Sequence, residues 1–135
     1  MAKKDNSIHK TGRRKTSVAR ATLVKGNGKL KVNNETLESY VGSSVLALKV
    51  REPLVVSGLG DKFDIKVNVF GGGQNSQSEA IRQAIARALV EVSGEELRKK
   101  FLDYDRSLLV SDTRFKEMKK PNNSHARAKR QKSYR

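Results

Sequence analysis

The chain has 135 residues, no cysteine and a formal net charge of +15. Its length suits a single domain, the missing cysteines exclude disulfides and thiolate sites, and no apolar run approaches the about 20 residues that span a bilayer. The charge lies at the ends, since residues 21–117 hold fifteen cations and thirteen acids. Basic ends favour nucleic acid over a membrane surface, because they lack the bulky apolar residues that a membrane helix needs. Without a signal peptide, we expect the protein to stay in the cytoplasm.

A strand followed by a tight turn is the first predicted element. Apolar and polar side chains alternate in residues 16–24. Asn27-Gly28 then predicts a type I′ turn, because both central residues of that turn take a positive φ. We expect residues 29–33 to return as the second strand of this hairpin.

The middle of the chain predicts helices on either side of a strand. Residues 36–50 fit one or two short helices, which Pro53 is expected to stop. Alternation in residues 62–70 is typical of a strand with one buried face. The apolar residues that follow recur every three or four positions, and Ser76 with Glu79 predicts a capping box at the start of this central helix.

A shorter helix and a last strand are predicted before the C-terminal arm. Ser93 with Glu96 predicts a second capping box, which opens a helix through about Asp103. Residues 108–110 are a candidate strand.

The predicted fold class is α+β, a small sheet with helices on one face. Residues 118–135 contain seven Lys or Arg, no acid and no periodic pattern. We therefore expect a globular RNA-binding domain of residues 1–117 and an extended basic tail of residues 118–135.

Three consecutive glycines, Gly71, Gly72 and Gly73, separate the predicted strand from the central helix. Free backbone N–H groups and the helix dipole at such a turn can hold a phosphate. A tight turn without a ligand is the alternative. The motif lacks the Gly-Lys-Ser/Thr of a P-loop and the spacing of a dinucleotide fingerprint, so an RNA backbone fits it better than a soluble nucleotide.

Basic residues near these elements are the other candidates. Arg13, Arg14 and Lys15 are adjacent cations at the edge of a strand, a pattern typical of a phosphate clamp. Arg82 and Arg87 are predicted to lie on the exposed side of the central helix and to extend a basic face from the glycine turn. Ordinary solvated arginines are the alternative.

No catalytic centre, metal site or cofactor is predicted. His9 and His125 are isolated in basic segments, without clustered carboxylates to complete a metal site. No set of nucleophile, base and orienting group stands out, so we expect a protein that is not an enzyme.

Together, these motifs resemble the bacterial-type small-subunit ribosomal protein nine family, over nearly the whole chain. The resemblance rests on three linked stretches: KTGRRKTSVARATLVKGNGKLKVNN, FGGGQNSQSEAIRQAIARALVE, and SDTRFKEMKK with the basic end. The chain ends Ser133-Tyr134-Arg135, where the family usually ends Ser-Lys-Arg.

The resemblance implies a mixed sheet like that of the second domain of ribosomal protein five, with a left-handed βαβ crossover. It implies a structural protein of the small ribosomal subunit, whose partners are the 3′ major domain of small-subunit rRNA, the peptidyl-site tRNA and neighbouring head proteins. The residues implied to face rRNA are Arg13, Arg14, Lys15, Gly71, Gly72, Gly73, Arg82, Arg114, Lys119, Lys120, Arg127, Lys129, Arg130 and Lys132. Those implied to lie near the tRNA are Ser133, Tyr134 and Arg135.

Two rival functions remain open from the residues alone. A DNA-binding architectural protein would have the same excess of cations, because electrostatic binding discriminates poorly between nucleic acids. A nucleotide-dependent enzyme could use the glycine turn.

Overall fold

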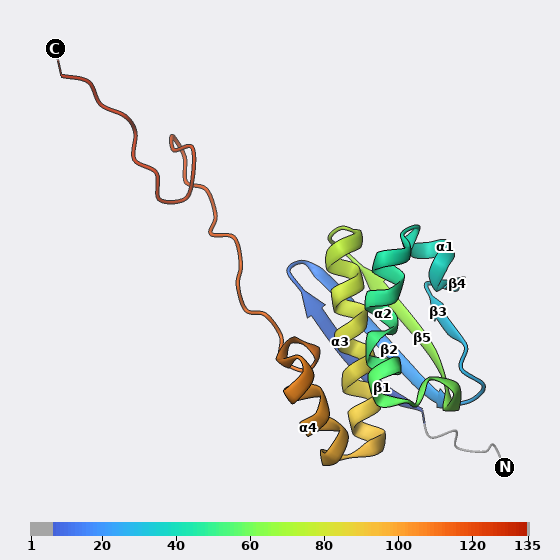
Figure 1. The fold of residues 1–135 in the computed structure, drawn as a ribbon. Helices are drawn as coiled ribbons and strands as arrows, with labels where there is room; N and C mark the ends of the chain where they lie inside the picture. Colours follow the sequence, from blue (N-terminus) through green and yellow to red (C-terminus); the bar gives the residue numbers. More distant parts are fainter. Residues whose placement is uncertain (1–6, 135) are drawn as a thin grey trace.

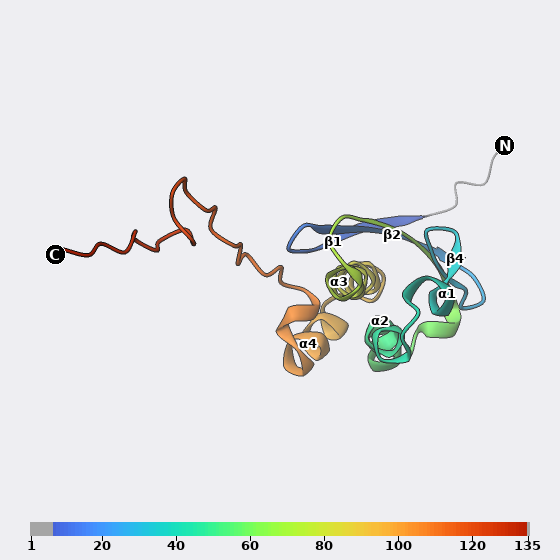
Figure 2. The same ribbon diagram turned by 90° about the horizontal axis from the view of Figure 1, so that it is seen from above.

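The computed structural model describes residues 7–134 as a five-stranded sheet covered on one face by helices, with a long arm leaving the body (Figures 1 and 2). The strands are β1 (Ile8–Arg14), β2 (Ser17–Lys25), β3 (Leu30–Val32), β4 (Glu35–Thr36) and β5 (Phe63–Phe70). The helices are α1 (Leu37–Val41), α2 (Ser44–Ser57), α3 (Gln74–Ser93) and α4 (Glu95–Tyr104), with short 3-10 helices η1 (Gly60–Lys62) and η2 (Arg106–Leu108). The predicted fold class is confirmed.

The strand order β1-β2-β5-β3-β4 places β5 between β2 and β3, which are neighbours in the sequence. β5 pairs antiparallel with β2 and parallel with β3, so the sheet is mixed. The chain connects the parallel pair through α1 and α2, which makes a βαβ unit. The left hand of this crossover stays a prediction.

The hairpin predicted at Asn27-Gly28 is wrong. The Asp64 carboxylate, on β5, accepts hydrogen bonds of 2.9 Å from the backbone N–H groups of both Asn27 and Lys29. These bonds, with that of Lys29 the largest cause, lower the pKa of Asp64. They hold the loop that contains Asn27 and Gly28 at the start of β5. β3 then pairs with the edge of β5 that β2 does not occupy.

The core lies between the sheet and α3. Alternation in β2 and β5 buries one side chain in two, as their patterns predict. The small residues Ala80 and Ala84 let α3 approach β1, where a Cβ on Gly12 would lie 2.1 Å from the Ala80 carbonyl oxygen. The backbones of β1 and α3 are therefore in direct contact.

The two predicted capping boxes are wrong, although both helices exist. α3 begins at Gln74, and Gly73 is the residue that caps it. Ser76 therefore lies inside the first turn, where its hydroxyl accepts a hydrogen bond of 3.1 Å from the Gly73 N–H. Ser93 is the last residue of α3, and Gly94, with φ of 81°, separates α3 from α4.

Two further element predictions also differ from the structure. Pro53 lies inside α2, which continues to Ser57 and ends where Gly58 takes a φ of 68°. In place of a strand at residues 108–110, η2 forms after Asp105, whose carboxylate accepts the Ser107 N–H at 2.8 Å.

Candidate nucleic-acid interface

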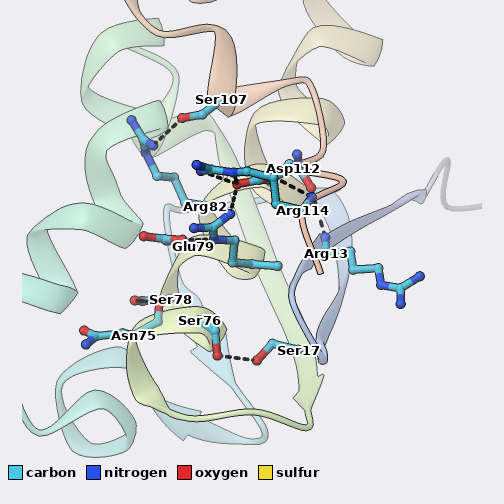
Figure 3. A network of polar contacts seen from close by, with 12 residues as sticks. Arg13, Ser17, Asn75, Ser76, Ser78, Glu79, Arg82, Ser107, Asp112 and Arg114 are labelled. Carbon is cyan, nitrogen blue, oxygen red and sulfur yellow. Dashed lines mark hydrogen bonds and ion pairs between the residues drawn. The ribbon is translucent and has the colours of Figure 1, made fainter. Parts of the chain in front are cut away.

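The basic cluster and the glycine turn lie together at one end of the sheet. β1 and β2 form a hairpin whose two-residue turn, Lys15-Thr16, follows directly on Arg13 and Arg14. Beside it, the Ser17 hydroxyl donates to the Gly71 carbonyl at 2.9 Å and lies 2.8 Å from the Ser76 hydroxyl, the pair drawn in Figure 3. Two segments that are distant in sequence thus form one surface, which we call the hairpin end (residues 13–17 and 71–76).

The glycine turn is shaped by its packing on this hairpin. Gly71 and Gly72 take φ of 76° and 64°, which favours glycine. A Cβ on Gly71 would lie 2.5 Å from the Thr16 carbonyl oxygen, whereas nothing lies within 4 Å of one on Gly73. The tight-turn interpretation therefore explains the first two glycines, and only Gly73 faces open space.

Substitutions are expected to distinguish a glycine that the tight turn requires, Gly72, from one that faces open space, Gly73. Gly72→Ala should lower the free energy of unfolding by about 2 kcal/mol, because φ is positive and the Cβ would lie 2.1 Å from the Ser17 hydroxyl oxygen. Gly73→Ala, the matched control, should change it by about 0.5 kcal/mol or less. Urea unfolding measures both. Equal losses would show that packing on Ser17 does not require glycine at position 72.

The three cations of the cluster are in different surroundings. The side chain of Arg14 is engaged, since its Nε lies 2.7 Å from Glu79 Oε2 and its Nη1 pairs with the Asp112 carboxylate. Arg13 and Lys15 are exposed. Arg13 and Lys15 are thus the cations of the cluster with exposed side chains, whereas Arg14 ties β1 to Glu79 on α3 and to Asp112.

Glu79 joins two cations from different elements. Its Oε1 lies 2.7 Å from Lys49 Nζ on α2, and its Oε2 contacts Arg14 on β1. Burial raises the pKa of Glu79, but the hydrogen bonds and charges of Lys49 and Arg14 outweigh burial and lower it overall.

Arg82 does not lie on the exposed side of α3, and that prediction is wrong. It is 8% exposed, and its guanidinium donates to Asp105 Oδ2 at 2.8 Å. The guanidinium also donates to the Ser107 hydroxyl at 3.2 Å, a bond drawn in Figure 3. Its Nε lies 2.6 Å from Glu52 Oε2, and the two side chains form an ion pair. The N–H of Nε does not point at that oxygen, so this contact is not a hydrogen bond. Burial opposes the charged form, but Asp105 and Glu52 raise the pKa of Arg82 overall.

Arg87 is likewise a structural residue. Its guanidinium donates to the carbonyl oxygens of Thr11 at 2.8 Å and Leu109 at 3.0 Å, and to the Ser111 hydroxyl at 2.9 Å. Burial lowers the pKa of Arg87. It ties β1 to the segment after η2 and does not extend a basic face.

The base of the tail is fastened to the hairpin end by Asp112. Its carboxylate pairs with Arg14 and accepts hydrogen bonds from Arg114 Nη2 at 2.8 Å and from the Arg114 backbone N–H at 2.9 Å (Figure 3). The hydrogen bonds from Arg114, with a smaller contribution from Arg14, hold the pKa of Asp112 well below its usual range. Arg114 itself stays 84% exposed at its side chain.

Beyond this point the chain runs away from the body in both ribbon views (Figures 1 and 2). Arg127 Nε lies 2.8 Å from Glu117 Oε2, and Lys120 Nζ lies 3.5 Å from Glu117 Oε1. The exposed residues of the arm include the predicted Lys119, Lys120, Arg127, Lys129, Arg130, Lys132, Ser133 and Tyr134. Arg135, also predicted to lie near tRNA, is outside the described residues.

Two arginine–phenylalanine pairs on the surface were missed in the sequence. The Arg13 guanidinium lies 5.1 Å from the centre of the Phe115 ring, and that of Arg20 lies 5.8 Å from the Phe70 ring. In the alternation of residues 62–70, Phe70 falls on the same face of β5 as the polar residues, so the sequence pattern could have predicted that its ring is exposed.

One hollow among the described residues measures about 480 Å³ and is lined by both cations and carboxylates, among them the paired Arg14, Glu79 and Arg82. Because these charges pair with one another, the hollow does not form an anion pocket. Within residues 7–134 no group of three or more His, Asp or Glu is placed to hold a metal ion, and no helix is long and apolar enough to cross a membrane.

Comparison with known proteins identifies the family. Residues 12–135 match the family described as ribosomal protein S9/S16. The small ribosomal subunit protein uS9 of Methanococcus maripaludis strain C5 is 46% identical over 133 residues, which cover 95% of this chain and 98% of that relative. The protein of the same name from Methanococcus vannielii is 44% identical over 133 residues, with the same coverage. These matches confirm the resemblance noted in the sequence: the chain belongs to the ribosomal protein S9/S16 family.

Proposed function

We propose that this chain, a protein of the small ribosomal subunit, binds small-subunit rRNA with its hairpin end and basic tail, and that the tail end reaches the peptidyl-site tRNA. The observation that carries the proposal is the Arg14–Asp112–Arg114 ion-pair group, which fastens the segment just before the tail to the hairpin end. This attachment brings the two basic segments together as one cationic track.

Exposed cations along this track suit an RNA backbone. Arg13 and Lys15 at the hairpin end, and the exposed Arg114 at the tail base, offer side chains that can displace the counterions condensed on phosphates. The tail lacks a core of its own, so its ordering must be offset by such contacts. Gly73 adds an open backbone approach at the start of α3. Arg82 and Arg87, which are bonded inside the body, are not part of this surface.

The finer partners follow from the resemblance of the motifs. They are the 3′ major domain of the rRNA, neighbouring proteins of the subunit head and, for Ser133, Tyr134 and Arg135, the peptidyl-site tRNA. The family is structural and not enzymatic, which confirms that expectation and disfavours the nucleotide-dependent enzyme. Its members belong to the ribosome, so this chain is placed in the ribosomes of the cytoplasm.

Deleting residues 133–135 is expected to weaken peptidyl-site tRNA binding about tenfold, because a charged contact to a phosphate is lost. Binding of labelled tRNA to reconstituted subunits measures the effect. Lys99→Ala on α4, which also removes one exposed cation, is the matched control and should leave tRNA binding unchanged. Loss of the protein from the subunits, or equal effects of the two variants, would contradict a specific role for the tail end.

A further inference from the structure

The face of the sheet away from the helices is open (Figure 2). The strand register aligns its side chains in rows that cross β1, β2 and β5. One row contains Arg13, Val18 and Phe70, and the next contains Thr11, Arg20 and Asn68. We call the surface formed by these two rows, together with Phe115 against Arg13, the open sheet face. It adjoins the hairpin end and shares Arg13 with it.

This face carries cations but almost no negative charge. Asp64 is the one acidic residue in β1, β2, β3 and β5, and its carboxylate is occupied by the N–H groups of Asn27 and Lys29. Beyond the open sheet face, Lys31 and Lys66 are exposed and directly paired on β3 and β5. The positive charge of the open sheet face, together with Lys31 and Lys66, is therefore complementary to a polyanion and unfavourable for a basic partner.

Two aromatic rings lie on this cationic surface. Phe70 is 53% exposed and Phe115 is 59% exposed, whereas Phe63 and Phe101 are buried in the core. Each exposed ring lies beside an arginine, at 5.8 Å from Arg20 for Phe70 and 5.1 Å from Arg13 for Phe115. Exposed rings interleaved with cations are the arrangement that binds single-stranded nucleic acid, since bases stack on the rings while the cations follow the backbone.

We propose that the open sheet face binds unpaired RNA nucleotides, with bases stacking on Phe70 and Phe115 and phosphates held by Arg13 and Arg20. This rests on the proposed function and adds to it a second surface and a class of ligand. Unpaired nucleotides are the occupant because only they expose the base faces, whereas a duplex presents its backbone. A double helix would use the cations and leave the two rings without a partner.

The test uses the full chain and two RNA probes, a single strand of about 10 nucleotides containing 2-aminopurine and a duplex of the same length. Phe70→Leu removes the ring but no charge. We expect it to weaken single-strand binding about tenfold, reduce quenching of 2-aminopurine, and leave duplex binding within about twofold. Phe70→Trp should restore both signals. Arg20→Gln should instead reduce the magnitude of the salt-dependence slope by about 0.7 for the single strand.

Leu48→Ala is the matched control, since Leu48 is 69% exposed on α2, on the helical side of the molecule. It should change neither binding nor quenching. Equal single-strand affinities for wild type and Phe70→Leu would overturn the proposal. This result is also the one expected if the open sheet face binds a protein instead of RNA. Sedimentation of the wild type with small subunits is followed in parallel. If the wild type does not sediment with small subunits, the proposed function is overturned. If it does sediment with them but Phe70→Leu binds the single strand as well as wild type does, only the proposed stacking surface is overturned.

Discussion

Gly12→Ala is expected to lower the free energy of unfolding by about 3 kcal/mol. A Cβ at this position would lie 2.1 Å from the Ala80 carbonyl oxygen and 2.6 Å from the Ala84 backbone nitrogen. Both are backbone atoms of α3, so the clash cannot be relieved by rotating a side chain. β1 would have to move off the helix. Urea denaturation followed by far-ultraviolet circular dichroism measures the loss.

Gly60→Ala is the control for this substitution. The nearest atom to its new Cβ would be the Leu54 Cβ at 3.7 Å, an ordinary contact, so we expect a change of about 0.5 kcal/mol or less. A Gly12→Ala protein as stable as wild type would show that β1 and α3 are not in close backbone contact. The glycine of the Thr-Gly-Arg-Arg-Lys motif thus positions the basic hairpin by packing, and the arginines after it act on that support.

Arg82→Ala is expected to cost about 3 kcal/mol of stability, because it empties the buried site of the guanidinium and leaves the half-buried Glu52 and Asp105 without their shared cation. Arg98→Ala is the matched control. Arg98 pairs with Glu95 at 3.2 Å on the exposed surface of α4, where such a pair contributes about 0.5 kcal/mol. Chemical denaturation at neutral pH compares the two. Similar small losses would contradict a structural role for Arg82.

The pH dependence of the Arg82 effect follows from Asp105. Burial raises the pKa of Asp105, but the hydrogen bonds from Arg82 and Ser107, together with the charge of Arg82, outweigh burial, so the folded-state pKa lies below the ordinary value of 3.8. The stabilisation is therefore present above about pH 4 and is lost as the pH falls through the lower folded-state pKa. The difference between wild type and Arg82→Ala should shrink in acid.

Much of the body could be predicted because local patterns and tertiary packing agree there. Alternation in residues 62–70 matches β5, which has one face against the helices. The repeat that predicts the central helix matches buried positions of α3 from Ala80 to Leu89, although Val92 at its end is exposed and Arg82 and Gln83 are buried as well. Gly42, with φ of 64°, separates α1 from α2, in line with the one or two short helices expected in residues 36–50. β5 and the middle of α3 bury the faces that their own sequences mark as apolar, whereas Leu48 and Val55 of α2 are exposed.

The wrong predictions depend on contacts between residues distant in sequence. The Asn27-Gly28 signal is strong locally, yet bonds to Asp64 from another strand decide the path of the loop. A two-residue hairpin turn with positive φ at both positions forms instead at Asn33 and Asn34, between β3 and β4. A polar side chain on a helix gives no sign that its partners come from two other elements, as those of Arg82 do.

The candidate interface could be predicted in its parts but not in its assembly. The basic cluster, the glycine turn and the tail are each visible in the sequence. Their union depends on the Ser17–Gly71 hydrogen bond and on Asp112, which pairs with a residue 98 positions away. Because Asp112 is one of thirteen acids in residues 21–117, the sequence alone does not show that it joins the tail to the hairpin end.

Sedimentation of a cell lysate on a sucrose gradient, with the protein followed by antibody before and after a high-salt wash, tests most directly whether this chain is an integral protein of the small ribosomal subunit. We predict stoichiometric co-migration with small subunits that survives the wash. A signal with the nucleoid, or free protein at the top of the gradient, would contradict it.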